Sequence, residues 1–263
     1  MNNKYGFCYQ GGKSRVAEMI VEKLPPADNF VDLFFGGGSI THAAMHSGKY
    51  KNFIANDLRQ TPQMWNRACD GIGTEYDRFV SREEFLRSED PIVQLTWSFG
   101  ASMNSYYCKG LNELIAKLIT SNDLEERYLS WHEVLKQLNS ATPGTIYNSY
   151  NTVRPACTIR NLKRLKGERK VFTSNESYSN VEIPSNSVVY ADPPYAGTKD
   201  YGYRFDSEAF WEWCRTRDFP VWISEMIAPD DFVSVLEYSK QAKFNKQSGM
   251  RKEHLFLHKK WLE

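Results

Sequence analysis

Ser187-Val188-Val189-Tyr190-Ala191-Asp192-Pro193-Pro194-Tyr195 runs from an apolar segment into a polar turn and is the best guide to the fold. Its first five residues predict a short buried strand. The last four place a carboxylate, two rigid prolines and an aromatic ring where that strand ends. Open α/β sheets bind their ligands beyond the carboxyl ends of their strands. The segment therefore predicts an α/β fold that carries its chemistry at this point.

Three residues of this turn, Asp192, Pro193 and Tyr195, suit the binding of a planar amine. The carboxylate and the Pro193 carbonyl can each accept a hydrogen bond from an amino group, and the tyrosine ring can stack on a flat ring. A nucleobase has both features. A strand that ends in a proline turn capped by Asp explains the same residues equally well, so the rest of the chain must decide.

Composition sets broad limits on the class of protein. The chain has 263 residues, a length that suits one large domain or a main domain with an insertion. Its 41% hydrophobic and 25% charged residues are typical of a soluble protein with a packed core. Its net charge of +1 predicts no general affinity for nucleic acid, so any such surface must be local. We expect no signal peptide, no membrane span and a cytoplasmic location. Five dispersed cysteines favour neither a disulfide framework nor a zinc site: Cys8, Cys69, Cys108, Cys157 and Cys214.

Apolar runs alternate with helical patterns at both ends of the chain. Strands are expected at 29–35, 52–55, 170–173, 188–191 and 220–224, and an antiparallel pair at 243–245 and 254–257. Helices are expected from Ser14, as a cap, to about Leu24, at 39–47 and at 207–215. Between them, helical patterns dominate at 82–87, 92–98, 111–119 and 124–138. We therefore predict a discontinuous catalytic α/β domain, 1–60 and 160–263, and a helical insertion at 61–159.

Gly36-Gly37-Gly38 follows the first predicted strand and precedes a predicted helix. Such a loop brings backbone N–H groups close to a ligand. Asp57 follows about twenty residues later, where an acid would hold ribose hydroxyls. A dinucleotide-binding loop fits less well, because Thr41 stands where the last glycine of that fingerprint belongs. A tight turn, with Asp57 as a simple cap, is the alternative without a ligand.

Gly12-Lys13-Ser14 is similar to part of a phosphate-binding loop, but Phe7 stands where that motif needs glycine. We therefore exclude an NTPase of this type. A lysine at a helix start opposes the helix dipole, so Lys13 is a candidate for a functional cation. An ordinary solvated lysine is the alternative.

Taken in chain order, these segments resemble Dam-type DNA adenine-N6 methyltransferases of the amino-methylating α group, the D12 class. The resemblance rests on five segments: Tyr9–Lys13, Asp32–Ser39, Asn56–Asp57, Phe172–Tyr178 and Asp192–Tyr195. It implies a Rossmann-like, S-adenosylmethionine-dependent methyltransferase sheet with an inserted helical domain for DNA recognition. It also implies site-specific transfer of a methyl group to N6 of a flipped adenine in double-stranded DNA.

The resemblance also assigns roles to individual residues. Asp192, Pro193 and Tyr195 are implied as catalytic, by binding the adenine amino group and stacking on the base. No metal is implied, because the sulfonium supplies the electrophile. The implied contacts of S-adenosylmethionine are Tyr9, Lys13, Asp32, Phe35, Gly36, Gly38, Asp57, Tyr178 and Asp192.

Contact with DNA must come from a local cluster of charge. Residues 154–170 are strongly basic, and the candidates for phosphate contacts are Arg154, Arg160, Lys163 and Arg164. A solvated helix face is the alternative explanation. The oligomeric state is left open, a monomer included.

Two other functions remain open on the sequence alone. Asp192 does not exclude RNA or another exocyclic amine as the substrate. A nucleic-acid-binding module that has lost catalysis on the same fold is the other, although Lys13, Asp57 and Asp192 argue against it. The recognition sequence does not follow from these motifs.

Overall fold

A computed structural model describes residues 3–98, 101–106, 111–121, 123–139, 154–195, 205–242 and 249–262. The chain divides into two compact units. The first, called the sheet unit below, comprises Lys4–Gly6, Gly12–Gln63 and Lys170–Glu263. The second, called the helical unit, comprises Met1–Asn3, Phe7–Gly11 and Met64–Arg169. Each is described by itself.

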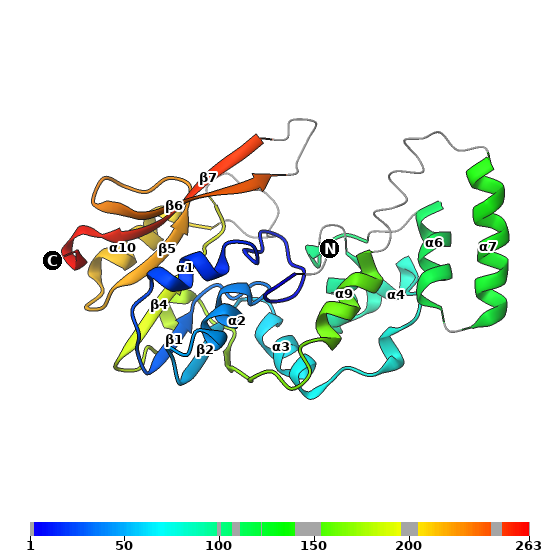
Figure 1. The fold of residues 1–263 in the computed structure, drawn as a ribbon, viewed down its shortest axis with the longest axis horizontal. Coiled ribbons are helices and arrows are strands. Elements are labelled where there is room, and N and C mark those ends of the chain that lie inside the picture. Colours follow the sequence, from blue (N-terminus) through cyan, green and yellow to red (C-terminus); the bar gives the residue numbers. More distant parts are fainter. Residues whose placement is uncertain are drawn as a thin grey trace. The chain divides into compact units, whose positions relative to one another are not determined.

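The sheet unit is built on a seven-stranded sheet, which Figure 1 shows, in the order β3-β2-β1-β4-β5-β7-β6. The strands are β1 (Asn29–Asp32), β2 (Asn52–Asn56), β3 (Phe172–Ser174), β4 (Ser187–Ala191), β5 (Val221–Glu225), β6 (Phe232–Ala242) and β7 (Gly249–His258). β1 pairs in parallel with both β2 and β4, while β7 is antiparallel to β5 and to β6. The predicted α/β class is confirmed, with a sheet that is mostly parallel.

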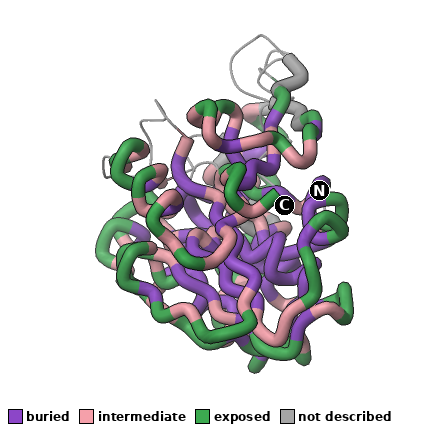
Figure 2. The backbone as a smooth tube through the Cα atoms, turned by 90° about the vertical axis from the view of Figure 1, so that its left-hand side faces the viewer, coloured by how far each residue is buried: buried purple, intermediate pink, exposed green. Residues whose placement is uncertain are grey.

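Both faces of the central strands are apolar, as a parallel sheet between helices requires. Val31 and Val189, which are register partners, pack on one face with Phe210 of helix α10 (Ser207–Thr216). Phe30 points the other way, since side chains alternate along a strand. It packs against the rings of Tyr50 and Tyr190. Figure 2 colours the buried parts of the backbone purple.

Two short helices precede or follow β1 in the chain. Helix α1 spans Ala17–Lys23, and helix α2 spans Ser39–His46. Helix α1 begins after Val16, so the predicted capping role of Ser14 is wrong. The Ser14 hydroxyl instead accepts a hydrogen bond from the Tyr5 N–H, because it lies before the helix rather than at its first turn.

Strand β6 is the main difference from the predicted strands. Residues 232–242 form a long hairpin with β7, whereas we expected residues 243–245 to pair with 254–257. Residues 243–245 lie outside the described residues, and 254–257 are confirmed as part of β7. Polar residues are frequent in β6, so its sequence lacks a clear apolar run. The pairing with β7 decides its structure instead.

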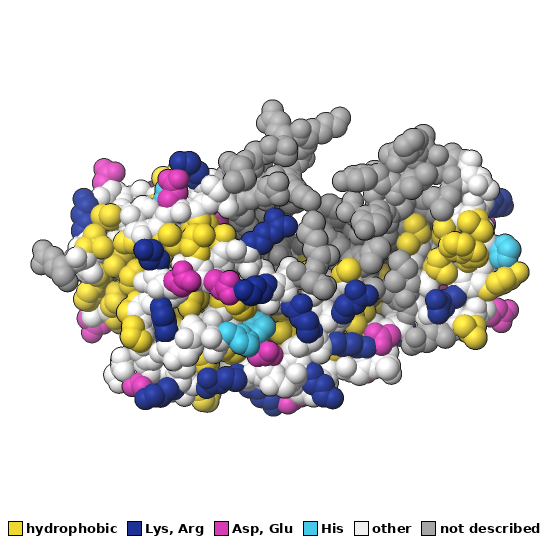
Figure 3. Space-filling view, viewed as in Figure 1, with side chains coloured by type: hydrophobic (Ala, Val, Ile, Leu, Met, Phe, Trp, Pro, Cys, Tyr) yellow, Lys and Arg dark blue, Asp and Glu magenta, His cyan; other side chains and the backbone are white. Residues whose placement is uncertain are grey.

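The helical unit carries most of its helices where the pattern predicted them. Its elements are α3 (Thr61–Asp70, which begins in the sheet unit), the 3₁₀ turn Thr74–Tyr76, α4 (Arg82–Arg87), α5 (Pro91–Trp97), α6 (Leu111–Thr120), α7 (Leu124–Asn139) and α9 (Arg154–Lys163). A small core forms around Phe85, Val93, Trp97 and Ala116. Among the described residues, α7 exposes several large apolar side chains, which Figure 3 shows gathered over that helix.

None of the helices in the described ranges combines the length and the apolar character that a membrane crossing requires. The four described cysteines, Cys8, Cys69, Cys157 and Cys214, are not in disulfides.

Candidate active site

Three strands that lie side by side end at the same edge of the sheet. In the order β2-β1-β4, all parallel, they are followed by Asp57, by the loop Leu33–Gly38 and by Asp192. The fold thus brings together, at one edge, residues that lie far apart in the sequence. This edge is the place where open α/β sheets bind ligands.

Lys13 is the cation of this site and is almost fully buried, with 2% of its side chain exposed. Its ammonium lies 2.9 Å from Asp192 Oδ1 and 3.2 Å from Glu253 Oε2. It also donates a hydrogen bond of 2.6 Å to the Tyr195 hydroxyl. An ammonium has one N–H for each of these acceptors, which satisfies the requirement that a buried charge be paired and hydrogen-bonded.

Electrostatics keep this lysine charged. Burial by itself lowers the pKa of Lys13, but the neighbouring Asp192 carboxylate, with Tyr238 and Glu253, outweighs burial, so the pKa lies above its ordinary value. Burial raises the pKa of Tyr195, and the negative charge of Asp192 raises it further. The Tyr195 hydroxyl therefore stays protonated, and Lys13 stays an ammonium, throughout the neutral range.

The loop after β1 is held closely by its neighbours. Gly36 and Gly38 have positive φ angles of 51° and 67°, which glycine adopts without strain. A Cβ at Gly38 would stand 2.4 Å from Cζ of Phe35, so the loop packs directly on that ring. The Phe35 N–H donates to the Asn56 carbonyl at 2.8 Å, which ties the loop to the end of β2.

Asp57 connects the glycine loop to the end of the neighbouring strand. Its Oδ2 accepts the Gly36 N–H at 2.8 Å and its Oδ1 accepts the Arg59 N–H at 2.9 Å. Burial raises the pKa of Asp57, and these two N–H groups oppose that rise. Each carboxylate oxygen has a further lone pair, so Asp57 can hold the loop and still accept a hydroxyl from a ligand.

Asp32, at the end of β1, is buried beneath this edge with 2% of its surface exposed. Its Oδ2 accepts the Thr41 hydroxyl at 2.7 Å, and its Oδ1 accepts the Phe34 N–H at 3.3 Å. Burial raises the pKa of Asp32 to about 7. These hydrogen bonds connect Asp32 to the loop after β1 and to helix α2. Its contact with a cofactor stays a prediction.

Tyr178 lies among aromatic rings beside the glycine loop. Its ring centroid is 5.7 Å from that of Phe34, 5.2 Å from that of Phe210 and 5.3 Å from that of Trp213. Tyr178 and Phe34 are both partly exposed. A partly exposed group of aromatic rings of this kind suits the adenine of a nucleoside.

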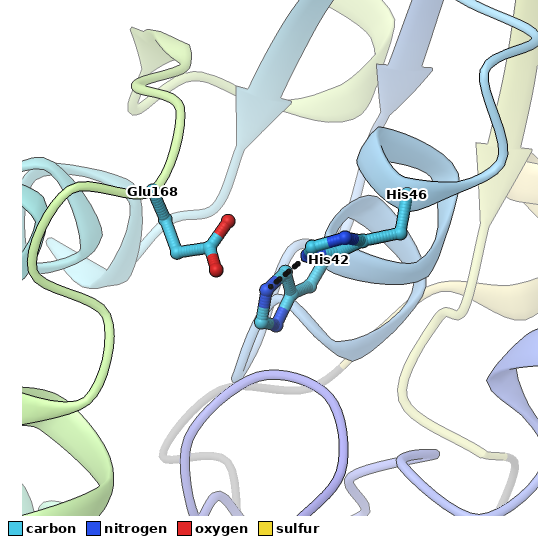
Figure 4. Close-up of side chains that lie close together, drawn as sticks. All are labelled: His42, His46 and Glu168. Carbon is cyan, nitrogen blue, oxygen red and sulfur yellow. Dashed lines mark hydrogen bonds between the residues drawn. The ribbon is translucent and has the colours of Figure 1, made fainter.

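The segment Lys4–Gly6 docks on the same loop. The Gly6 N–H donates to Nδ1 of His42 at 3.0 Å, and a Cβ at Gly6 would stand 2.3 Å from the Gly37 carbonyl oxygen. Figure 4 shows that the His42 and His46 rings point toward one another, with their Nε2 atoms 3.1 Å apart. These histidines were not singled out from the sequence, and their role here is to hold the start of the chain.

Two acids of the site were also missed in the sequence. Glu253 lies on β7, and Glu225 ends β5 and accepts the N–H of Met226 at 2.8 Å. Both are buried, and burial raises the pKa of Glu225 to about 7. Both acids could have been predicted from their place in a strand, at a position whose side chain points into the protein. Charged residues are rare there unless they have a partner.

The remaining predicted residues are less closely tied to this edge. Tyr9 is partly exposed and belongs to the helical unit, so its contact with a cofactor stays a prediction. On α9, Arg160 is exposed, Lys163 pairs with Asp77, and Arg164, just past the helix, donates to the Asn3 carbonyl. The side chain of Arg154 lies outside the described residues.

Comparison with known families identifies the chain. The D12 class N6 adenine-specific DNA methyltransferase family matches residues 9–212, which is more than half of the 263 residues. No curated protein matches the chain. The chain belongs to the D12 class and is an adenine-specific DNA methyltransferase, and its mostly parallel sheet agrees with the fold of that family.

Proposed function

We propose that this D12-class enzyme takes its methyl group from S-adenosylmethionine and transfers it to N6 of an adenine that has left double-stranded DNA. The observation that carries the proposal is the position of Asp192, at the end of β4 and 2.9 Å from the buried Lys13 ammonium. A carboxylate in this position is fixed, charged and partly exposed, with 22% of its side chain accessible.

The residues at this edge of the sheet fit S-adenosylmethionine in their chemistry. Asp57 supplies acceptors for ribose hydroxyls, as a strand-end acid does in nucleoside-binding sheets. Phe34 and Tyr178 supply an apolar wall for the adenine. Gly36 and Gly38 let the backbone approach the ligand. Asp192 and Asp57 together favour a cationic ligand, and the sulfonium supplies an electrophilic methyl group when the cofactor is bound.

Asp192 acts on the substrate amine. Adenine N6 is a weak nucleophile because its lone pair is delocalised into the ring. By accepting an N6–H hydrogen bond, Asp192 makes the nitrogen more pyramidal and stabilises the positive charge that develops on it. The carbonyl of Pro193 accepts the second N6–H. These groups act by position and fixed charge, since both are set before the base arrives.

Tyr195 completes the base site. Its hydroxyl is held by Lys13 at 2.6 Å, and the ammonium lies 5.0 Å from the centroid of its ring. The ring is therefore restrained and ready to stack on a base. A base that leaves the duplex loses stacking and pairing worth roughly a few kcal/mol, and stacking on Tyr195 returns part of that energy.

Double-stranded DNA is the substrate we expect, and the helical unit is the part we expect to recognise it. Among the predicted phosphate contacts, Arg160 is exposed on α9 and suits such a contact. We expect the enzyme to act in the cytoplasm, where its thiols stay reduced.

The test is methyl transfer from labelled S-adenosylmethionine to duplex DNA, followed by analysis of the nucleosides. We expect label in N6-methyladenine with the wild-type protein. Asp192→Ala and Asp192→Asn should lower the rate by about 10³-fold, the scale of losing a key electrostatic contact, with an unchanged circular dichroism spectrum. Asp230→Ala, which removes an exposed carboxylate, is the control and should retain full activity. Normal turnover by a folded Asp192→Ala protein would contradict the proposal. A preference for single-stranded DNA would contradict double-stranded DNA as the substrate.

A further inference from the structure

Lys13 is shared between two carboxylates that come from different parts of the sheet. Asp192 follows the parallel strand β4, and Glu253 belongs to the antiparallel strand β7, 61 residues later in the chain. The ammonium is 2.9 Å from the first carboxylate and 3.2 Å from the second. Lys13 therefore connects the turn that contains Asp192 to the β6–β7 hairpin.

The exposures of these three side chains differ in a way that sets their roles. Lys13 and Glu253 are 2% and 4% exposed, whereas Asp192 is 22% exposed. Asp192 is thus the member of the trio that a ligand can reach. Glu253 can influence a substrate only through Lys13 or through its charge.

The charges of the trio do not cancel. One lysine and two carboxylates sum to −1, as long as all three are ionised. An isolated Lys13–Asp192 pair would be neutral, and the ammonium would draw charge away from the Asp192 oxygens. Because the Lys13 ammonium also binds Glu253, it neutralises less of the charge on Asp192. The accessible Asp192 carboxylate therefore keeps net negative charge. Charges in a partly buried site are screened less than charges at the surface.

The register partner of Glu253 shows to which face of the hairpin its side chain points. Glu253 and Tyr238 are register partners in the β6–β7 hairpin, so their side chains lie on the same face. Tyr238 is buried and donates its hydroxyl to Ser224 at 3.0 Å. This packing holds the Glu253 carboxylate against Lys13 before any ligand binds.

We propose that Glu253 is a positioning residue of the methyl-transfer site, which holds Lys13 against Asp192 and Tyr195 and makes the charge of the Lys13–Asp192–Glu253 trio net negative. The inference rests on the proposed function, because a negative site favours a sulfonium over the neutral thioether product. It also favours the positive charge that develops on adenine N6 during transfer. Glu253 thereby links the β6–β7 hairpin to the chemistry at the end of β4.

The first test compares Glu253→Gln with Glu237→Gln. The amide of the first variant keeps an oxygen acceptor for Lys13 but removes the charge. The second removes a carboxylate from the same hairpin that forms an exposed pair with Lys252. For Glu253→Gln we expect kcat to fall about tenfold, equivalent to about 1.4 kcal/mol. We expect the KM for DNA to change less than about threefold, since the group acts on the reacting atoms. Glu237→Gln should match wild type.

The second readout does not depend on turnover. Calorimetric titration should show that Glu253→Gln lowers the preference for S-adenosylmethionine over S-adenosylhomocysteine by about threefold or more, because only the first is a cation. A purely structural role would weaken both ligands equally. Equal loss for both, or behaviour identical to that of Glu237→Gln, would overturn the proposal.

A double-mutant cycle keeps the proposal falsifiable if Glu253→Gln is unstable. In a Lys13→Met background, Glu253→Gln should cause no further loss of transfer and should restore part of it, because it removes the unpaired negative charge beside Asp192. Additive losses would show that Glu253 does not act through Lys13. A wild-type protein that binds no S-adenosylmethionine would contradict the proposed function itself. An active wild type with a fully active Glu253→Gln variant would contradict only the role of Glu253.

Discussion

The sheet unit and the helical unit differ in how far a local sequence pattern predicts where a side chain lies and what it contacts. In the sheet unit, the strand-end residues Asp57 and Asp192 lie at one edge, with Lys13 bonded to the second. In the helical unit, Lys163 and Arg164, two of the four predicted DNA contacts, are bonded within the unit to Asp77 and to the Asn3 carbonyl. A residue that follows a parallel strand has one edge at which to emerge. A basic residue on a helix shares its face with its neighbours, but its spacing does not reveal what that face packs against.

The largest effect is expected at Lys13 in the sheet unit. Lys13→Met should lower methyl transfer by about 10³-fold, a scale typical of losing a key electrostatic group, because Asp192 and Glu253 would then face each other without a cation. Neighbouring like charges disfavour the ionised form of a carboxyl group, and Asp192 would lose the ammonium that stabilises its charge. Single-turnover transfer to duplex DNA measures the loss. Lys51→Met, which removes an exposed lysine paired with Asp28, is the control. A fully active Lys13→Met enzyme would show that Asp192 does not need the Lys13 ammonium for methyl transfer.

The next effect concerns the glycine loop of the sheet unit. Gly38→Ala should lower the free energy of unfolding by about 2–4 kcal/mol, since the new Cβ meets the Phe35 ring at 2.4 Å and φ is 67°. Gly48→Ala is a matched control, with φ of 72° and no atom within 4 Å of the new Cβ. It should cost only about 1 kcal/mol of backbone strain. Urea denaturation measures both, and equal losses would show that packing on Phe35 adds nothing.

A smaller effect should appear in the pH dependence of stability. Burial raises the pKa values of Asp32 and Glu225 to about 7 from ordinary values of 3.8 and 4.5. Between those values, the folded state binds more protons than the unfolded state. The stabilisation is therefore complete below about pH 4 and is lost as pH rises through about 7. Glu225→Gln should remove part of this slope, by about 2 kcal/mol between pH 5 and 8 at 1.36 kcal/mol per pKa unit. Urea midpoints measured across this range test it, and a slope unchanged by the substitution would count against a shifted Glu225.

The smallest effects are expected on α9 and would sharpen the contrast between the units. Arg160→Ala should weaken DNA binding by about 1 kcal/mol and reduce the salt dependence of the affinity by about one phosphate contact. Lys163→Ala should change the salt dependence less, because that ammonium is paired with Asp77. It should instead lower stability by about 0.5 kcal/mol, typical of a partly exposed ion pair. Fluorescence anisotropy at several salt concentrations distinguishes the two. Equal salt slopes for both variants would mean that the pair with Asp77 opens when DNA binds.

Local pattern predicted the parallel part of the sheet and part of β7, but it did not predict the position of β6. Val188 to Ala191 form an uninterrupted apolar run, which marks a strand covered on both faces. Strand β6 has polar residues at many positions, and only its pairing with β7 shows it to be a strand. The first strand was predicted to reach Phe35 but ends at Asp32, because the Leu33 to Phe35 segment turns into the glycine loop. Apolar residues in that turn pack against Tyr178 and Phe210, which a search for apolar runs cannot distinguish from a strand.

The sequence by itself determined the α/β class, the family and the residue types of the turn from Asp192 to Tyr195. These follow from segments a few residues long, whose apolar runs, glycines and strand-end acids act on their immediate backbone. Only the tertiary structure decided that Lys13 is shared by Asp192, Tyr195 and Glu253. That arrangement joins Lys13 to three positions that lie 179 to 240 residues later in the chain. Sheet order and register bring them within hydrogen-bond distance, and the burial of the lysine requires that every one of its donors be matched.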